Sequence, residues 1–213
     1  MHSKRLTISN LWPIPKKGNK FIVVAKNKNI LGIPVLVAMR DILKHVQTRK
    51  ELKKILLEKK VEVNGIPIKD DRYSLLLFDT IGLPSLKKYY KISLSNSGKI
   101  SFEETDDKKA NVKLVKIVNK KIIPGNIIQL GMNDGRNILS KEKVNVGDSI
   151  LLNLKDKKIE KHISFKEKAD VLIIKGRYLG NKGKIEKIND SDVTVLLETG
   201  KVNLNKGALM VLD

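Results

Sequence analysis

The chain has 213 residues, and 43 lysines and arginines against 23 aspartates and glutamates give it a formal net charge of +20. It has no cysteine, which excludes disulfides, thiolate zinc sites and cysteine nucleophiles, and its 41% hydrophobic and 4% aromatic residues favour several small modules over one large core. No apolar run reaches the roughly 18 residues of a membrane span, and the first residues lack the apolar region of a secretory signal, so we expect a cytoplasmic protein.

The positive charge is concentrated in the first part of the chain. Residues 1–60 contain 15 basic and 3 acidic residues, whereas residues 61–110 contain 8 of each. Such an excess favours a partner with dense negative charge, because each neutralised phosphate of a nucleic acid releases condensed counterions. Nucleic acid is therefore the first expected partner, and an anionic membrane surface is the second.

Residues 1–34 are predicted to form a basic arm that is ordered by a partner. Pro13 and Pro15 exclude a helix, and Phe21 to Ala25 is suited to one short strand. Trp12 has two possible roles, stacking on a base and anchoring the arm on the protein's own core, of which we favour the second. The expected phosphate contacts of the arm are Lys4, Arg5, Lys16, Lys17 and Lys20.

Residues 35–103 are predicted to form a small α+β domain that starts with two helices. Apolar residues at helical spacing predict a helix over 35–46, and Thr48 followed by Glu51 predicts the capping box of a second helix. Cations near the start of a helix oppose its dipole, so phosphate binding would explain them, and a solvated helix face is the alternative. The cations concerned are Arg40 and Lys44 on the first helix and Arg49, Lys50, Lys53 and Lys54 on the second.

The rest of this domain is predicted to be β-structure. Asn64-Gly65 lies between two short apolar runs, which is a strong signal for a hairpin over 61–68. Further strands are expected at 74–81, 89–94 and 100–102. The highly charged stretch 103–109 lacks apolar residues and is predicted to be a surface loop at a domain boundary.

From residue 104 onward the pattern is all β and divides into two modules. A central β domain over 104–169 is expected to have strands at 112–118, 127–130, 149–154 and 158–163. The module over 170–213 is expected to have strands near 171–174, 183–188, 193–197 and 208–212, and strands this short and regular predict a small SH3-like β-barrel. His162 is isolated in the sequence, so we interpret it as structural rather than catalytic.

The last module contains glycines at a distinctive spacing. Gly176, Gly180 and Gly183 lie four and three positions apart, and glycines permit tight turns and close backbone approach. The loop also presents the cations Arg177, Lys182 and Lys184. It is not a Walker A phosphate loop, because Lys184 is followed by isoleucine rather than by serine or threonine. The segment from Gly176 to Ile185 resembles the KOW motif of ribosomal and transcription-elongation proteins.

Further motifs extend the resemblance over the whole chain. Residues 35–68 resemble the αL RNA-binding domain of bacterial small-subunit ribosomal proteins, with the departure that Lys60 stands where many such domains have glycine. Other short motifs occur in a fixed order along the chain. Two lie in the arm, around Lys4-Arg5 and Trp12-Pro13, and two lie further on, at Leu77 to Ile81 and Asn133 to Ile138. In this order, the motifs make the chain resemble the S4e family of archaeal and eukaryotic small-subunit ribosomal proteins.

This resemblance implies an α+β, multi-module structural protein of the small ribosomal subunit that is not an enzyme. Its implied partners are small-subunit rRNA and neighbouring ribosomal proteins, and no cofactor, metal, membrane or small-molecule substrate is expected. Arg136 and the KOW loop would make secondary RNA contacts. Reversing the charges of Arg49, Lys50, Lys53 and Lys54 together is expected to abolish incorporation into the subunit and to leave the fold intact.

Two other functions fit parts of the pattern. Domains of the αL type are often joined to RNA-modifying enzymes, but residues 111–213 are too few and too rich in strands for a catalytic domain. We interpret Asp79 as a turn or salt-bridge residue rather than a catalytic acid. A KOW module also suits a transcription-elongation or translation factor, and the αL domain argues against that function.

Overall fold

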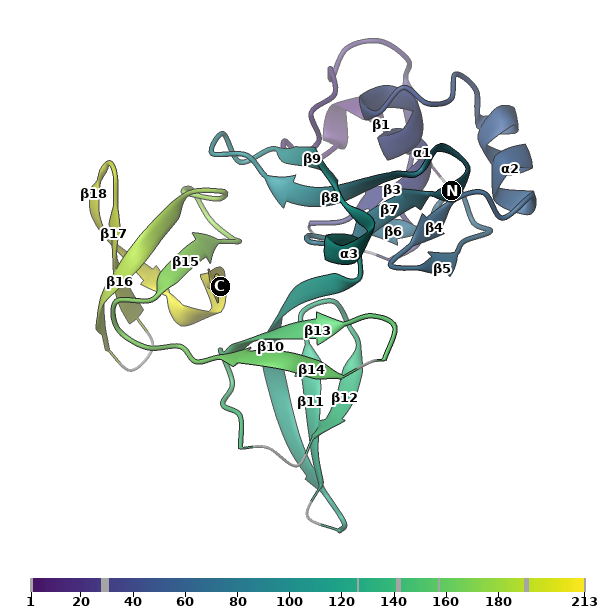
Figure 1. The fold of residues 1–213 in the computed structure, drawn as a ribbon. Helices are drawn as coiled ribbons and strands as arrows, with labels where there is room; N and C mark the ends of the chain where they lie inside the picture. Colours follow the sequence, from purple (N-terminus) through teal and green to yellow (C-terminus); the bar gives the residue numbers. More distant parts are fainter. Residues whose placement is uncertain are drawn as a thin grey trace. The chain divides into compact units, whose positions relative to one another are not determined.

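The computed structural model describes residues 2–27, 31–125, 127–140, 143–156, 158–189 and 192–212 (Figure 1). β-Strands dominate these residues, and the helices among them are short. By its internal contacts the chain divides into two compact units, the first comprising residues 1–95 and 99–111 and the second residues 96–98 and 112–213. The predicted α+β, multi-module class is therefore confirmed in its coarser form, as a mostly β chain with several sheets.

The first unit is built on a five-stranded antiparallel sheet in the order β5-β4-β7-β8-β9. Its strands are β4 (Glu62–Val63), β5 (Ile66–Pro67), β7 (Thr80–Leu83), β8 (Lys88–Leu94) and β9 (Ile100–Thr105). Alternate residues of β8 are buried, namely Tyr90, Ile92 and Leu94, because successive side chains of a strand point to opposite faces. A separate two-stranded pair is formed by β3 (Ile33–Pro34) and β6 (Ser74–Leu75).

The hairpin predicted at Asn64-Gly65 is confirmed. Asn64 has a φ of 55° and Gly65 a φ of 73°, as the favoured two-residue hairpin turn requires. The single strand expected over 74–81 is wrong, because the chain turns at Phe78, whose φ is 63°, between β6 and β7. The Asp79 carboxylate stabilises this turn by accepting hydrogen bonds from Leu76 N and Asn64 Nδ2, both at 2.7 Å.

The first predicted helix forms, but it is short and irregular. α1 (Val35–Val37) continues as a π-helix, η2 (Ala38–Ile42), in which the Leu43 amide donates to the Ala38 carbonyl at 2.9 Å. Lys44 has a φ of 56°, which helical backbone does not allow. The regular helix expected over 35–46 is therefore wrong in length, although its apolar residues 35–39 are buried.

The second predicted helix and its cap are confirmed as α2 (Arg49–Leu57). Thr48 Oγ1 accepts a hydrogen bond from the Glu51 amide at 3.2 Å, and the Glu51 carboxylate accepts one from the Thr48 amide at 3.5 Å. These two bonds satisfy amides that a helix otherwise leaves unpaired at its start. Leu52 and Leu56 are buried beneath the helix.

The described part of the arm is packed on the first unit. β1 (His2–Lys4) pairs with β2 (Phe21–Val23), which confirms the short strand, and η1 (Arg5–Thr7) is a single 3₁₀ turn. Trp12 Nε1 donates to the Gly32 carbonyl at 3.2 Å, while Leu11 and Ile14 are buried. Of its two possible roles, Trp12 therefore has the anchoring one.

The surface loop expected over 103–109 is wrong. β9 runs to Thr105, and α3 (Asp107–Ala110) follows it; earlier, η3 (Pro84–Leu86) links β7 to β8. Glu103 lies opposite Lys91 in the β8–β9 register, and the Glu103 carboxylate accepts a hydrogen bond from Ser93 Oγ. Cross-strand partners thus hold charged residues in a strand that has no apolar pattern of its own.

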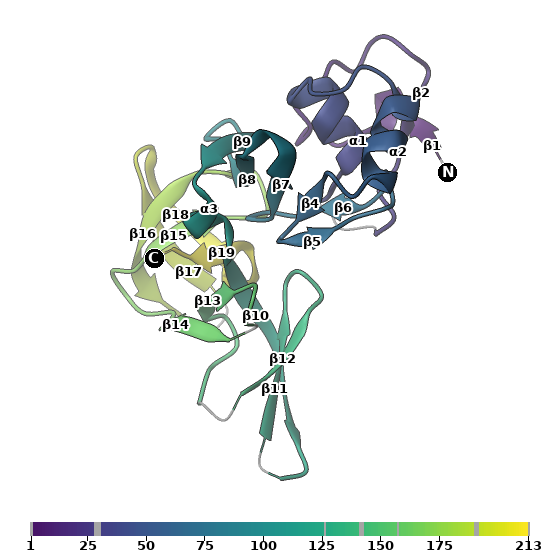
Figure 2. The same ribbon diagram turned by 45° about the vertical axis from the view of Figure 1, so that its right-hand side comes forward.

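The second unit begins with an antiparallel sheet in the order β12-β11-β10-β13-β14. Its strands are β10 (Val112–Ile123), β11 (Ile127–Met132), β12 (Asn137–Ser140), β13 (Ser149–Asn153) and β14 (Ile159–Ile163). Four of them match the predicted strands, and β12 was not predicted. β10 continues past its pairing with β13, so that β10 and β11 extend as a long hairpin (Figure 2).

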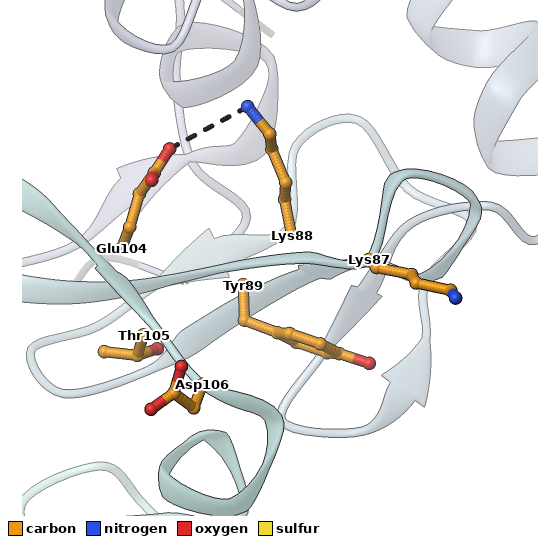
Figure 3. A pocket seen from close by; sticks show the side chains of 6 residues that line it. All are labelled: Lys87, Lys88, Tyr89, Glu104, Thr105 and Asp106. Carbon is orange, nitrogen blue, oxygen red and sulfur yellow. Dashed lines mark ion pairs between the residues drawn. The ribbon is translucent and has the colours of Figure 1, made fainter.

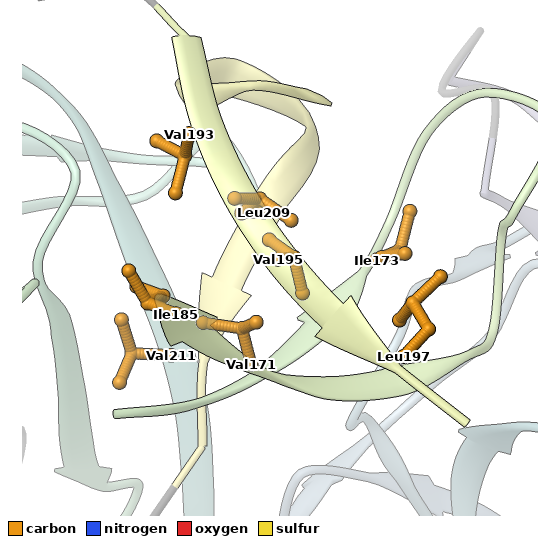
Figure 4. Packing of buried hydrophobic residues seen from close by; sticks show 8 residues of the cluster. All are labelled: Val171, Ile173, Ile185, Val193, Val195, Leu197, Leu209 and Val211. Atoms are coloured by element: carbon orange, nitrogen blue, oxygen red, sulfur yellow. The ribbon is translucent and has the colours of Figure 1, made fainter. Parts of the chain in front are cut away.

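The C-terminal part of the second unit is a further antiparallel sheet in the order β18-β17-β16-β15-β19. Its strands are β15 (Asp170–Ile173), β16 (Lys182–Ile188), β17 (Asp192–Leu197), β18 (Gly200–Asn205) and β19 (Leu209–Val211), with the 3₁₀ turn η4 (Lys206–Ala208) before the last. A cluster of β-branched and leucine side chains, including Val171, Ile185 and Val195, fills the concave side (Figure 4). β18 was not predicted.

Lys116 is a buried cation that joins the two sheets of the second unit. It lies on β10 and is 5% exposed, and its ammonium donates to the carbonyl oxygens of Lys206 at 2.8 Å and Leu209 at 2.6 Å. Burial lowers the pKa of Lys116 to about 8, and the nearby positive charges of Lys175 and Lys206 add to this effect. The junction therefore contains a group that loses its charge at mildly alkaline pH.

The unfolding free energy should reflect this shift. Because the pKa of Lys116 is about 8 in the folded chain and ordinarily 10.5, the unfolded chain binds more protons between these pH values, and stability rises with pH there. Relative to Lys116→Met, the wild type should gain roughly 1–2 kcal/mol between pH 7.5 and 9.5. Urea denaturation at both pH values measures the difference, and parallel pH profiles of the two proteins would contradict the assignment.

Candidate nucleic-acid interface

The α2 surface presents three lysines to solvent. Leu52 and Leu56 occupy the buried face of the helix, so Lys50, Lys53 and Lys54 lie on its exposed side. Within the part of the chain that the structure describes, none of the three forms an ion pair within 4.0 Å. These α2 lysines are a cluster of available cations on one short helix.

Arg49, the fourth predicted cation of this helix, has a structural contact. Its Nε lies 2.5 Å from Asp71 Oδ2, and the Asp71 side chain is only 7% exposed. The Asp71 carbonyl also accepts a hydrogen bond from the Leu36 amide at 3.1 Å. Arg49 thus attaches the start of α2 to a buried carboxylate, so we now predict that reversing its charge disturbs the fold as well as any RNA contact.

Of the two predicted cations near the first helix, one is paired and one is exposed. Arg40 donates from Nε and a terminal nitrogen to the two oxygens of Asp41, at 3.1 and 2.8 Å. These hydrogen bonds raise the pKa of Arg40. Lys44, at the left-handed residue where the helix ends, is exposed.

The arm shows the same division between arginine and lysine. Arg5 Nε donates to the Pro15 carbonyl at 2.8 Å and so holds the two ends of the arm's loop together. The lysines of the arm, Lys4, Lys16, Lys17 and Lys20, are exposed. Lys20 lies with its ammonium 5.4 Å from the centre of the Phe21 ring, a weak contact at an exposed site.

In the second unit Arg136 belongs to a buried ion-pair network. The Asp134 carboxylate accepts a hydrogen bond from Lys113 Nζ at 2.9 Å, and Arg136 Nε lies 3.5 Å from the same oxygen. The side chains of Lys113 and Asp134 are 2% and 3% exposed, whereas that of Arg136 is 36% exposed. Arg136 therefore neutralises a buried carboxylate and is only partly available to a ligand.

The KOW loop, residues 176–184, brings its predicted cations to the surface. Gly176 and Gly180 have φ values of 94° and 88°, which a side chain would strain. Arg177, Lys182 and Lys184 are exposed. Lys182 and Lys184 share one face of β16, because residues two apart in a strand point the same way.

Two features of the described residues bear on other functions. His162 Nε2 lies 2.8 Å from the buried Asp148 carboxylate, which also accepts from the amides of Asn145 and Phe165, so this histidine has a structural contact. No group of three or more metal-ligating side chains occurs within the described ranges. None of the helices in those ranges has the length and apolar character needed to cross a membrane.

Sequence reasoning missed the structural role of the arginines and the buried lysines of β10. Most partners of the arginines are remote in the chain. Arg5 contacts Pro15, Arg49 contacts Asp71, and Arg72 contacts Val24, which are 10, 22 and 48 positions away. Arg136 contacts Asp134, two positions away. Lys113 and Lys116 stand among buried apolar residues of β10, and that apolar surrounding was the available signal. Lys59, exposed and with a φ of 55°, also lies beside the α2 lysines in sequence.

Comparison with known proteins finds related chains over most of the length. Residues 86–159 match the Ribosomal family S4e, and residues 167–198 match the KOW motif. The chain is 33% identical over 190 residues to the small ribosomal subunit protein eS4 of Methanocella arvoryzae, with 88% of this chain and 80% of that protein aligned. It is 35% identical over 188 residues to the eS4 of Archaeoglobus fulgidus, with 87% and 79% aligned.

A solved structure is similar over most of the chain. The crystal structure of the 30S ribosomal protein S4e from Thermoplasma acidophilum matches with a TM-score of 0.72 and 26% sequence identity. The match covers 85% of this chain and 95% of that chain. Both units therefore have counterparts in a known fold.

Because Arg49 of α2 pairs with a carboxylate and Lys53 forms no ion pair within the described residues, their substitution should affect the unfolding free energy differently. Arg49→Met leaves the buried Asp71 carboxylate without its cation and should lower the unfolding free energy by roughly 1–3 kcal/mol. Lys53→Met, the matched control on the same helix, should change it by less than about 0.5 kcal/mol. Urea denaturation measures both, and equal effects of the two substitutions would show that Arg49 has no structural role.

Proposed function

The chain belongs to the S4e family of ribosomal proteins and is a structural, non-enzymatic component of the small ribosomal subunit, and we propose that it binds small-subunit rRNA through exposed lysines. The surfaces concerned are the α2 lysines, the lysines of the arm together with Lys44, and the KOW loop. Neighbouring ribosomal proteins and a cytoplasmic location on the ribosome belong to the same proposal.

The observation that carries this proposal is the unpaired state of the α2 lysines. Lys50 lies in the first turn of the helix, where a cation opposes the helix dipole, whereas Lys54 lies in the last turn, where the dipole favours a cation. The described residues supply no acidic partner within ion-pair distance. Phosphates of an RNA would supply the missing negative charge, and their contact would release condensed counterions.

The proposal assigns unequal roles to the predicted RNA contacts. We propose that the exposed cations contact phosphates. They are Lys4, Lys16, Lys17, Lys20, Lys44, Lys50, Lys53, Lys54, Arg177, Lys182 and Lys184. Arg5, Arg40, Arg49 and Arg136 have internal partners and are proposed to place the nearby lysines. The division into an arm (1–34), an αL domain (35–103), a central β domain (104–169) and a KOW barrel (170–213) is likewise proposed as the functional organisation.

Charge reversal at the α2 lysines tests the proposal. The triple variant Lys50→Glu, Lys53→Glu, Lys54→Glu should fold normally and fail to enter small subunits in a reconstitution assay. Its affinity for small-subunit rRNA should also depend less on salt, by roughly 0.7–0.9 in the log–log slope for each lost phosphate contact.

A matched control separates this surface from net charge alone. Lys155→Glu, Lys158→Glu, Lys166→Glu changes the charge by the same amount at exposed lysines outside the proposed surfaces. It should retain both incorporation and salt dependence. Normal incorporation of the α2 variant, or equal loss in both variants, would refute α2 as a principal contact.

A further inference from the structure

A cavity of about 330 Å³ lies in the first unit where β8 begins and β9 ends (Figure 3). Its lining residues are Lys87, Lys88, Tyr89, Glu104, Thr105 and Asp106. The volume is at the lower end of the range for small-ligand sites. The lining combines an aromatic ring, cations and hydrogen-bond acceptors, which together limit the chemistry that it can bind.

The glycine on the neighbouring strand leaves room for the Tyr89 ring. Gly82 is the register partner of Tyr89, and a β-carbon at Gly82 would come within 3.1 Å of Tyr89 Cδ1 and Cε1. The absence of that carbon lets one edge of the ring lie close over the β7 backbone. Tyr89 is only partly buried and lines the cavity, so it offers an aromatic surface to a ligand there.

The charged lining residues lie on both sides of the strands, and the paired Lys88 and Glu104 side chains point to the side opposite the Tyr89 ring (Figure 3). Lys87, with a φ of 51°, is exposed at the start of β8, and Lys88 Nζ lies 4.0 Å from Glu104 Oε1. Asp106 is exposed, and its side chain lies on the same side of the strands as Tyr89 and Thr105 (Figure 3).

We propose that this cavity binds one unpaired nucleotide of single-stranded RNA, an inference that rests on the proposed RNA-binding function. Unpaired bases are recognised by stacking on aromatic rings and by hydrogen bonds to their exposed edges. Tyr89 stacks on the base, Lys87 contacts its phosphate, and the Asp106 carboxylate accepts hydrogen bonds from the base edge.

The acceptor-only character of a carboxylate sets the base preference. Guanine presents two adjacent N–H donors on its Watson–Crick edge, whereas uracil flanks its single N–H with carbonyl oxygens that a carboxylate repels. The site should therefore prefer guanosine to uridine. Lys88 and Glu104 are paired with each other, and Lys87 favours a ligand that carries a phosphate over a cationic side chain of a protein partner.

Binding of labelled heptanucleotides to the full chain tests the site. An all-uridine heptamer with one central guanosine should bind more tightly than the all-uridine heptamer. Tyr89→Ala should weaken binding of the guanosine heptamer roughly 5- to 100-fold, the range for loss of one stacking contact. Asp106→Asn should abolish the preference for guanosine, because it weakens binding of the guanosine heptamer and removes the repulsion of the uracil carbonyl oxygens.

Two further variants keep the test decisive if Tyr89→Ala unfolds the unit. Gly82→Ala retains the ring but puts a β-carbon against it, and it should weaken guanosine binding. Tyr73→Ala removes a partly exposed tyrosine of the same unit that does not line the cavity, and it should bind like the wild type.

The outcomes distinguish the cavity from the proposed function. If the wild type binds small-subunit rRNA but Gly82→Ala and Asp106→Asn leave heptamer binding unchanged, the nucleotide site is refuted and RNA binding stands. If the wild type binds neither RNA, both proposals fail. Tighter, Tyr89-dependent binding of an arginine-rich heptapeptide would assign the cavity to a protein partner and overturn the inference.

Discussion

Buried carboxylates hold the connecting segments of both units in place. Asp71, Asp79, Asp134 and Asp148 are almost completely shielded from water. Asp71 pairs with Arg49, and Asp79 accepts hydrogen bonds from the Asn64 side-chain amide and the Leu76 backbone amide. Asp134 pairs with Lys113 and Arg136. Asp148 contacts His162 and accepts hydrogen bonds from the backbone amides of Asn145 and Phe165. A buried carboxylate is costly unless it is paired in this way, so each of these contacts is a strong constraint on the loop that supplies it.

This use of acidic residues also shapes the outer surface. The chain has 23 acidic residues against 43 basic ones, and those placed in the interior cannot neutralise exposed lysines. Two arginines, Arg49 and Arg136, pair with buried carboxylates while their own side chains stay partly exposed. A planar guanidinium can also donate two bonds to one carboxylate, as Arg40 does to Asp41. The lysines of α2, the arm and the KOW loop remain at the surface, whereas Lys113 and Lys116 of β10 are buried. The same distribution of charge therefore stabilises the fold and leaves lysines exposed on the surfaces that we propose to bind RNA.

Local signals were sufficient for the elements that depend on neighbouring residues. The capping box of α2 and the Asn64-Gly65 turn follow from side chains within a few positions, and both are present as predicted. The π-helix η2 at Ala38–Ile42 and the strands β12 and β18 could not be predicted from local sequence, because they depend on tertiary contacts and strand pairing. β9 likewise continues through Glu103 and Glu104, whose cross-strand partners replace an apolar pattern.

Residue type and spacing identified the α2, arm and KOW-loop cations but not their availability. Arg49 looks equivalent to Lys50 in sequence, and only the fold brings it to Asp71, 22 positions further along the chain. The cavity beside Tyr89 was also beyond prediction, since it requires Gly82 of β7 to lie opposite that ring. Long-range register, rather than composition, decides which charged or aromatic side chains are free to bind.

Ultraviolet crosslinking in cells, followed by sequencing of the attached RNA and mass spectrometry of the attached peptides, tests the central claim most directly. The account predicts small-subunit rRNA at a few discrete positions, joined to peptides from α2, the arm and the KOW loop. Crosslinks dominated by transfer or messenger RNA, or an absence of crosslinked RNA at these segments, would contradict it.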